Sequence, residues 1–383
     1  MRVACLGGGP AGLYFAILMK KLNPGHQITI IERDGPDDTF GWGIVFSDQT
    51  FSYLKENDYE SYASIIAASE VWDNVDVLHK GQKVTIRGNR FSGIARLAFL
   101  NILQNRCLDL GVEMRFQTNL SDLRELRDHD LLVGADGANS LVRRTYSQFF
   151  QPLLDWRKNK YIWLGSNQLF HGLTLTFRQT EAGLFIAHSY KFSKTTSTFI
   201  VECSDDVWQK AGLDEKSDRE TCEYLEEVFK DDLGGYPLLS NNFVKWLNFL
   251  LVKNRHWSHN NVALLGDALH TSHFSIGSGT KLALEDAIAL AKCFEPNADV
   301  RPALSEFEMI RKPVIEEYQE AAHSSLVWFE TARLDMHLDP YALAYKLMTR
   351  SKRIDYEGLK RRDPEFIAAY DARCAPSDAR AEQ

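Results

Sequence analysis

The stretch GGGPAG, Gly7–Gly12, decides the fold, because it joins an apolar run to a helical pattern through one short turn. Gly7, Gly9 and Gly12 fit the G-x-G-x-x-G spacing of dinucleotide-binding βαβ units. The first glycine allows the tight turn, the second lets the backbone approach a pyrophosphate, and the third lets the helix pack on the strand. The residues before the turn predict a buried strand, and residues 11–25 predict a helix.

The predicted helix begins near Pro10 and Ala11, and the unpaired N–H groups of its first turn, to which proline contributes none, can bind an anion. The next apolar run, HQITIIER, predicts a second strand and places Glu32 and Arg33 about 20 residues after the glycines. A carboxylate there accepts hydrogen bonds from ribose hydroxyls and repels a 2′-phosphate. The site is therefore expected to hold NAD or the ADP half of FAD, and not NADP.

Two further glycine-aspartate turns decide between NAD and FAD. They are GADGANSLVRR, residues 134–144, and LLGDALHTSHFSIGSGTKLALEDA, residues 264–287. A dehydrogenase with one dinucleotide needs neither turn. With these three ordered motifs the chain resembles the group A flavoprotein monooxygenases, the para-hydroxybenzoate hydroxylase-like family.

The resemblance implies that the first motif binds the ADP part of FAD and that the second contributes to FAD and nicotinamide binding. It also implies that Asp267 contacts the ribityl and pyrophosphate region and that Arg96 lies near the FAD. Two positions depart from the family pattern, because Phe274 stands where proline is usual and Lys281 where asparagine is usual. The predicted cofactor-binding residues are Gly7, Gly9, Pro10, Ala11, Gly12, Glu32, Arg33, Arg96, Asp136, Gly137, Arg143, Gly266, Asp267, Gly277, Gly279 and Thr280.

A narrower resemblance covers nearly the whole chain. Segments such as RDGPDDTFGWGIVFSDQT (residues 33–50), NKYIWLGSNQLF (159–170) and LKRRDPEF (359–366) resemble the salicylyl-CoA 5-hydroxylases. They also resemble the monooxygenase half of 2-aminobenzoyl-CoA monooxygenase/reductase and the tryptophan hydroxylase of violacein biosynthesis.

This resemblance implies an FAD-dependent aromatic monooxygenase. NADH or NADPH would reduce the flavin, O₂ would form a flavin C4a-hydroperoxide, and salicylyl-CoA would be hydroxylated at position 5 to gentisyl-CoA. Anthraniloyl-CoA and tryptophan, or another indole, are the alternative substrates. A flavin-bound regulatory protein and a plain NAD-dependent dehydrogenase, whose purified protein would be colourless, are the alternatives from other classes.

The sequence offers several candidates for a catalytic base and for substrate contacts without choosing among them. The catalytic candidates are His188, His270 and His273, because histidine can exchange a proton near neutral pH, although a histidine in such a position is more often structural. The substrate candidates are Gln168, Tyr190, Phe274, Arg157 and Lys160. A thioester substrate also predicts an anion site for the CoA phosphates, for which a late basic cluster is a further candidate: Arg350, Lys352, Arg353, Lys360, Arg361 and Arg362.

The middle of the chain is rich in β-branched and aromatic residues separated by turn signals, which predicts an antiparallel sheet. We therefore expect an α/β fold in which a Rossmann-like FAD-binding domain carries an inserted antiparallel β-sheet substrate domain, followed by a helical C-terminal region. The expected FAD-binding domain is residues 1–75, 92–150 and 255–300. The expected substrate domain is residues 76–91 and 151–254, and the helical region is residues 301–383.

Composition excludes several other classes of function. A net charge of −8 over 383 residues makes nucleic acid an unlikely partner, and small-molecule substrates with O₂ are expected instead. The six cysteines are scattered without a C-x-x-C pair, which argues against a zinc site and against a disulfide framework. With no leader and no apolar run near 20 residues, we expect a cytoplasmic protein without a membrane span, and a homodimer is one expected assembly.

Overall fold

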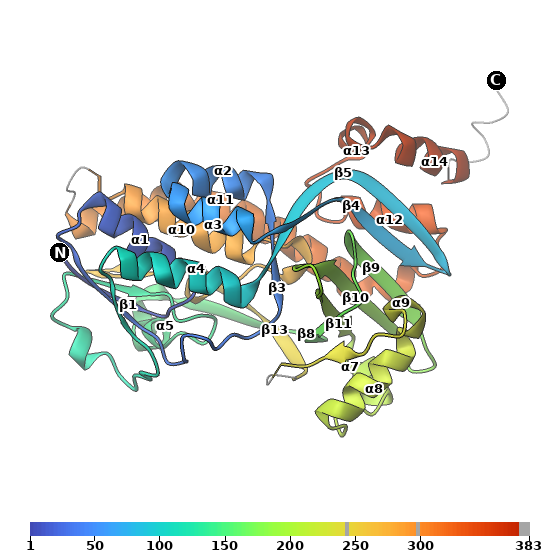
Figure 1. Ribbon diagram of the computed structural model, residues 1–383, viewed down its shortest axis with the longest axis horizontal. Helices are drawn as coiled ribbons and strands as arrows, with labels where there is room; N and C mark the ends of the chain where they lie inside the picture. The colour runs from blue at the N-terminus through green and yellow to red at the C-terminus, as the bar shows by residue number, and fades with distance from the viewer. Residues whose placement is uncertain (242–244, 296–298, 375–383) are drawn as a thin grey trace.

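The computed structural model describes residues 1–241, 245–295 and 299–374. These residues form two β-sheets that lie side by side, with helices above, below and behind them (Figure 1). The short α5 (Leu141–Thr145) and α6 (Ser147–Phe150) follow the second glycine-aspartate turn. The last nine residues of the predicted helical region, 375–383, lie outside the described residues.

The first sheet is the nucleotide-type sheet that the sequence predicts. Its neighbouring strands are parallel except for the β14–β15 pair at one edge. The central strand β1 is an apolar run because neighbouring strands and helices bury it on both faces. In spatial order the strands are β14 (Ser258–His259), β15 (Val262–Leu264), β7 (Leu131–Gly134), β1 (Arg2–Leu6), β2 (Gln27–Ile31) and β6 (Glu113–Arg115).

Helices of this part gather beside the first sheet. Helix α1 packs against both α4 and α10, and α4 also contacts α3 (Figure 1). Helix α1 is buried along nearly its whole length, which explains why its sequence is apolar on every side. The helices are α1 (Pro10–Leu22), α2 (Asp48–Asn57), α3 (Tyr59–Ala67), α4 (Arg96–Asp109) and α10 (Gly279–Lys292).

The second sheet is antiparallel apart from one pair, because β4 and β9 run parallel. That parallel pair is a departure from the predicted antiparallel sheet. In spatial order the strands are β12 (Leu238–Leu239), β8 (Pro152–Ser166), β11 (Ser197–Cys203), β10 (Leu184–Lys191), β9 (Leu173–Gln179), β4 (Glu70–His79), β5 (Gln82–Ala95) and β3 (Gly43–Ser47), and β13 (Leu247–Asn254) also pairs with β8.

Helices cover both faces of this second sheet. On one face β8, β10 and β11 pack against α7 (Asp205–Lys210), α8 (Asp218–Val228) and α9 (Lys230–Leu233). On the other face β4, β5 and β9 pack against four C-terminal helices. These are α11 (Val300–Thr331), α12 (Pro340–Thr349), α13 (Tyr356–Arg362) and α14 (Pro364–Cys374).

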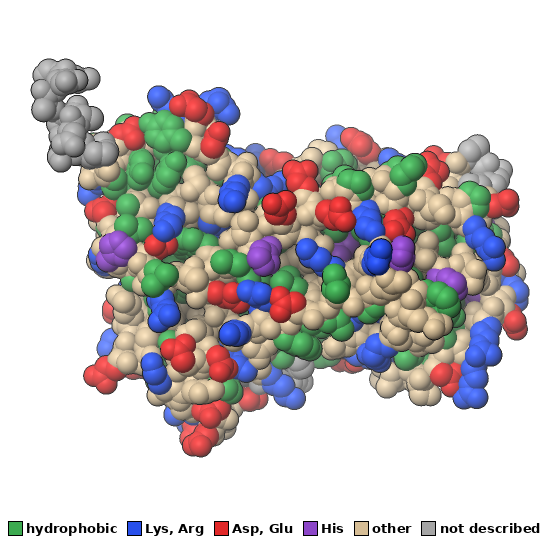
Figure 2. Space-filling model, turned by 180° about the vertical axis from the view of Figure 1, so that it is seen from behind, with side chains coloured by type: hydrophobic (Ala, Val, Ile, Leu, Met, Phe, Trp, Pro, Cys, Tyr) green, Lys and Arg blue, Asp and Glu red, His purple; other side chains and the backbone are tan. Residues whose placement is uncertain are grey.

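The predicted α/β fold with a β-rich second part and a helical C-terminal region is confirmed. The division into domains remains a proposal, and its expected boundaries at residues 75 and 92 fall within the continuous strands β4 and β5. None of the helices in the described ranges is long and apolar enough to cross a bilayer. On the face drawn in Figure 2, basic and acidic side chains are interspersed among apolar ones.

Candidate functional site

Two of the three motif glycines are required by contacts within the protein itself. Gly7 follows β1 with φ +109°, and a Cβ atom there would lie 2.2 Å from the carbonyl oxygen of Ala135. A Cβ atom on Gly12 would lie 2.3 Å from the carbonyl oxygen of Gly7. These glycines let α1 and the β7 turn pack directly against the loop.

Gly9 is different, because no contact within the protein explains it. Its φ of −79° and ψ of 179° suit any residue, and an added Cβ would find no atom within 4 Å. Gly9 directly precedes α1, which starts at Pro10 and has no side-chain cap on its first N–H groups. The loop therefore leaves space and free donors for an anion at the helix N-terminus.

Glu32 lies where the sequence places it, at the end of β2 and beside the glycine loop. The Gly8 N–H donates to Glu32 Oε2 over 2.6 Å, and the Asp34 N–H donates to Oε1 over 3.0 Å. The carboxylate is thereby fixed in orientation next to the loop. Arg33 instead has an exposed side chain that pairs with Asp34 at 3.3 Å.

The side chains of the second motif form hydrogen bonds within their own turn and to the third motif. Asp136 accepts hydrogen bonds from the Ser140 hydroxyl and the Leu141 N–H, both at 2.5 Å. The buried Arg143 donates to the carbonyl oxygens of Ala138 and Ala268, the latter at 2.8 Å, and so joins the second motif to the third. Asp136 and Arg143 thus position backbone around the site, and Gly137, with φ +76°, makes their turn possible.

The third motif meets the first at the same place. A Cβ atom added to Gly266 would lie 3.1 Å from Ala11 Cβ. The Asp267 side chain is exposed, but crowding by the surrounding protein raises the pKa of its carboxyl, and His270 and then Arg96 act against the rise. Arg96 Nε is itself buried and has no hydrogen-bond partner among the described residues.

A second free helix N-terminus lies in this third motif. Gly277 has φ +61°, and a Cβ atom there or on Gly279 would meet nothing within 4 Å. Helix α10 begins at Gly279 and Thr280 without a side-chain cap, and it packs against α1. The residues present therefore fit FAD, because they offer two uncapped helix N-termini, the Glu32 carboxylate, an exposed aspartate and a buried arginine nitrogen without a hydrogen-bond partner among the described residues.

The loop at residues 41–43 connects this region to the second sheet. A Cβ atom on Gly41 would lie 2.6 Å from the Trp163 ring, so the loop packs directly on β8. The Gly43 N–H donates to the Thr198 hydroxyl over 3.0 Å, and the Tyr190 hydroxyl donates to the Gly43 carbonyl oxygen over 2.8 Å. Tyr190 therefore holds the loop on the sheet, and burial raises the pKa of its hydroxyl.

Phe274 lies at the centre of an aromatic cluster between the third motif and the second sheet. Its ring centroid lies 5.0 Å from Tyr161, 5.4 Å from His188 and 4.2 Å from His273. A cavity of about 10 Å³, space for one water-sized molecule, adjoins the cluster. The residues lining it are Arg157, Asn159, Tyr161, Glu202, Phe249, His273, Phe274, Leu326 and Glu330.

Two of the three candidate histidines reach this cluster. The His188 Nε2 lies 3.1 Å from Glu202 Oε1 in a buried pair, so the carboxylate fixes the ring and leaves Nδ1 as the second nitrogen. His273 Nδ1 accepts the Ser275 N–H over 3.4 Å and lies 2.8 Å from the Ser275 hydroxyl. Burial, and then the nearby His188, hold the pKa of His273 well below its usual range, so His273 is neutral at pH 7.

Other candidates lie away from the cluster. His270 Nε2 lies 2.8 Å from Asp286 Oδ2 in a buried network. Lys160 lies 4.4 Å from the centroid of the Trp208 ring, on the sheet face covered by α7. Gln168 follows β8 and lies against Gly234 at the end of α9.

Arg157 does line the cavity, and its guanidinium forms a two-point ion pair with Glu330 at 3.1 and 2.6 Å. Sequence reasoning missed Tyr161, Trp163 and Glu202, which alternate along β8 and β11 with core residues and so face the cluster. A carboxylate in the apolar strand TFIVEC was the available signal for Glu202.

The chain is similar to several known proteins. A family model described as "FAD binding domain" matches residues 1–295. The chain is 40% identical over 362 residues to salicyloyl-CoA 5-hydroxylase of a Streptomyces species, which covers 92% of this chain and 70% of that protein. It is 34% identical over 355 residues to protodeoxyviolaceinate monooxygenase of Chromobacterium violaceum, which covers 92% of this chain and 95% of that protein.

The fold is also similar to a solved structure. A crystal structure of 2-methyl-3-hydroxypyridine-5-carboxylic acid oxygenase superposes with a TM-score of 0.72, covering 94% of this chain and 98% of that chain at 17% identity. At this identity the likeness concerns the fold alone.

Proposed function

We propose that this chain, which belongs to the family of FAD-dependent aromatic monooxygenases, hydroxylates salicyloyl-CoA at position 5 to give gentisyl-CoA. The family uses FAD with NADH or NADPH as reductant, and its substrates are small aromatic molecules and O₂. The observation that carries the choice of substrate is the 40% identity with a salicyloyl-CoA 5-hydroxylase across 92% of this chain. The phenol of salicylate activates the carbon para to it, which is position 5.

Bound FAD would supply flavin reduction and the activation of O₂. The chain would hold it with the glycine loop, Glu32, Asp267 and the N-terminus of α10, in the arrangement described above. Tyr161, Trp163 and Phe274 would hold the aromatic ring and exclude water from the reacting carbon.

His188 is the best-placed group to accept the phenol proton of the substrate. Its Nε2 is held by Glu202 at 3.1 Å, so Nδ1 is available as a base, and its ring lies against Phe274. Removing that proton makes position 5 more nucleophilic. His273, kept neutral by burial, is placed to orient polar groups of the substrate without adding positive charge.

Arg157 and Glu330 neutralise each other beside the cavity. Arg157 is therefore proposed to shape the substrate pocket rather than to supply a free cation. Gln168 and Lys160, which lie away from the aromatic cluster, carry no role in this proposal.

The experiment compares NADH and NADPH oxidation with salicyloyl-CoA, anthraniloyl-CoA, free salicylate and tryptophan, with product masses measured for each. A hydroxylated product from salicyloyl-CoA, with free salicylate inactive, supports the proposal. Turnover of free salicylate in preference to the thioester contradicts it.

The second candidate is hydroxylation of a substrate without CoA, such as tryptophan or another indole. The observation that favours it is the 34% identity with the protodeoxyviolaceinate monooxygenase. A product from tryptophan alone would support this candidate.

The described cysteines are unpaired, which supports the further proposal of a cytoplasmic enzyme. A homodimer is also proposed, and light scattering would test it.

A further inference from the structure

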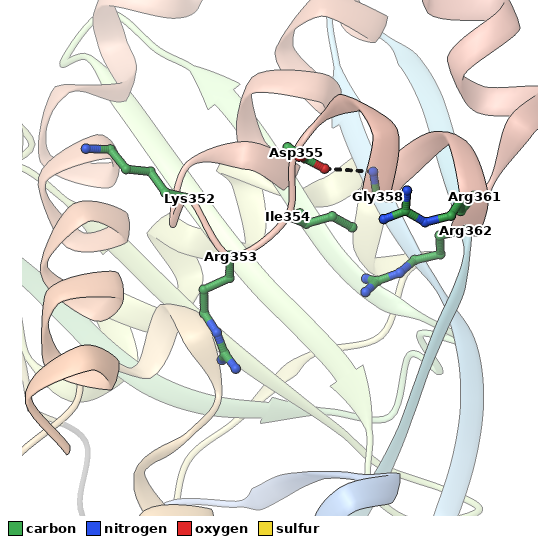
Figure 3. A pocket seen from close by; sticks show the side chains of 7 residues that line it. All are labelled: Lys352, Arg353, Ile354, Asp355, Gly358, Arg361 and Arg362. Atoms are coloured by element: carbon green, nitrogen blue, oxygen red, sulfur yellow. Dashed lines mark hydrogen bonds between the residues drawn. The ribbon is translucent and has the colours of Figure 1, made fainter. Parts of the chain in front are cut away.

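An open pocket of about 610 Å³ lies between the α12–α13 connection and α13, beside β5. Figure 3 shows Arg361 and Arg362 leaving α13 on one side and Arg353 lying across from them, with Ile354 between. Lys352 extends from the same connection as Arg353 and also lines the pocket. Four cations therefore line the pocket, which is large enough for a ligand of nucleotide size.

None of these four cations forms an ion pair with a carboxylate in the part of the chain that the structure describes. Other cations of β5 and α12 are paired: Lys83 with Asp76, Arg87 with Glu365, and Lys346 with Asp335, at 2.6 to 2.9 Å. Asp355, the acidic residue in the lining, uses one carboxylate oxygen to accept the Gly358 N–H over 2.7 Å (Figure 3). The pocket therefore keeps an excess of positive charge.

Two of the four cations are held in place by uncharged partners. Arg353 donates to the Tyr318 hydroxyl over 3.2 Å and lies 4.4 Å from the centroid of its ring. Arg362 donates to Asn89 Oδ1 over 2.7 Å. Such contacts orient a guanidinium without neutralising it, which suits recognition of phosphate.

The pocket is joined to the functional site by direct contacts. Tyr318 also accepts a hydrogen bond from Lys281 Nζ over 2.8 Å, and Lys281 belongs to the first turns of α10. Arg350, at the end of α12, donates to the Ser275 carbonyl oxygen over 2.6 Å, next to Phe274. Hydrogen bonds therefore connect the pocket lining through Tyr318 to α10, the helix that follows the segment carrying Phe274.

We propose that this pocket binds the 3′-phospho-ADP end of the CoA thioester, while the acyl end reaches the cluster around Phe274. The inference rests on the proposed function, because that function supplies a substrate with a remote group of clustered phosphates. The diphosphate of NADH offers related chemistry, so the test separates the two sources. Lys352 and Arg361 are the cleanest positions to change, since both are exposed and neither side chain bonds to another described residue.

The test uses the FAD-loaded Lys352→Ala/Arg361→Ala double variant and adenosine 3′,5′-bisphosphate as the probe, with the dissociation constant measured by calorimetry. We expect that constant and the KM for salicyloyl-CoA to rise about tenfold, since charge-assisted contacts to phosphate are lost. Three values should not change: the kcat, the KM for NADH, and the KM for salicyloyl-pantetheine, a thioester that lacks the nucleotide. Arg301→Ala, an exposed cation in the first turn of α11, is the matched control and should leave every value unchanged.

Unchanged bisphosphate affinity in the double variant would overturn the proposal. A rise in the KM for NADH alone would also overturn it, because that result would assign the pocket to the reductant. If the wild-type protein hydroxylates free salicylate and ignores the thioester, the proposed function fails. The calorimetry still decides in that case whether the pocket binds the bisphosphate.

Discussion

Gly9→Ala separates what the cofactor requires from what the fold requires. The backbone at Gly9 suits alanine, and the added methyl group would meet no protein atom within 4 Å. Without FAD the free energy of unfolding should therefore change by no more than about 0.5 kcal/mol, or rise slightly because alanine restricts the unfolded chain. With FAD the methyl group would occupy space where the pyrophosphate approaches the helix N-terminus.

An overpacked contact costs about 1–3 kcal/mol, so the dissociation constant for FAD should rise by about five- to 150-fold. Gly7→Ala is the contrasting variant. Its methyl group would lie 2.2 Å from the Ala135 carbonyl oxygen at φ +109°, and it should lower the free energy of unfolding by about 2–5 kcal/mol even without FAD.

The assays are urea unfolding of the apoprotein and flavin fluorescence titration for both variants. The reasoning about Gly9 is refuted if Gly9→Ala binds FAD as tightly as the wild type. It is equally refuted if the Gly9→Ala apoprotein loses as much stability as the Gly7→Ala apoprotein.

Three further predictions follow from buried charges and from the proposed base. His188→Gln should lower kcat with salicyloyl-CoA by about 10²-fold while FAD content is unchanged, and a kcat within twofold of the wild type would remove His188 as the base. Burial alone would raise the pKa of Asp58, but hydrogen bonds led by that of Arg106 outweigh burial and hold this pKa well below its usual range. The ionised Asp58 therefore stabilises the fold above its unfolded pKa of about 3.9, and this stabilisation is lost as the pH falls from there toward the folded-state pKa. Asp58→Asn should therefore lower stability by about 1–3 kcal/mol at pH 7. Urea unfolding at descending pH should show this deficit shrinking as pH falls below the unfolded pKa of Asp58 and toward its lowered folded-state pKa, and a deficit independent of pH would argue against the charge. Arg311→Met should destabilise by about 3–5 kcal/mol because Asp286 is left buried, with one partner lost, and a thermal unfolding scan that matches the wild type would contradict this.

The glycine loop could be predicted from the sequence because its requirements are local. The positive φ of Gly7, the close approach at Gly12 and the carboxylate at the end of the next strand all leave their marks within one βαβ unit. The ordered glycine-aspartate motifs extended that prediction to the third turn, which the structure brings to within contact of Ala11.

The candidate histidines illustrate what local patterns do not contain. His270 and His273 are three residues apart, yet His270 pairs with Asp286 inside the helical layer while His273 reaches the aromatic cluster. His188 lies on β10 of the second sheet and reaches Phe274 only through the packing of that strand against the third motif. Tertiary contacts determine which histidines reach the aromatic cluster, and local sequence patterns do not predict those contacts.

The basic candidates on β8 show a missed signal. Arg157 and Lys160 are three residues apart on one strand, and an odd spacing on a regular strand points side chains to opposite faces. The structure has this arrangement, with Glu330 of α11 on one side and Trp208 of α7 on the other. Strand alternation is by itself enough to assign these two residues to different faces of the sheet.

The central claim, oxygen transfer to an aromatic thioester by an FAD enzyme, is tested most directly by one isotope measurement. The FAD-loaded protein is supplied with NADH, salicyloyl-CoA and isotopically heavy O₂ in ordinary water, and the thioester product is analysed by mass spectrometry. We predict a hydroxylated salicyloyl thioester that carries one heavy oxygen atom from O₂. A product with oxygen from water, or NADH oxidation that yields only hydrogen peroxide and unchanged thioester, would contradict the account.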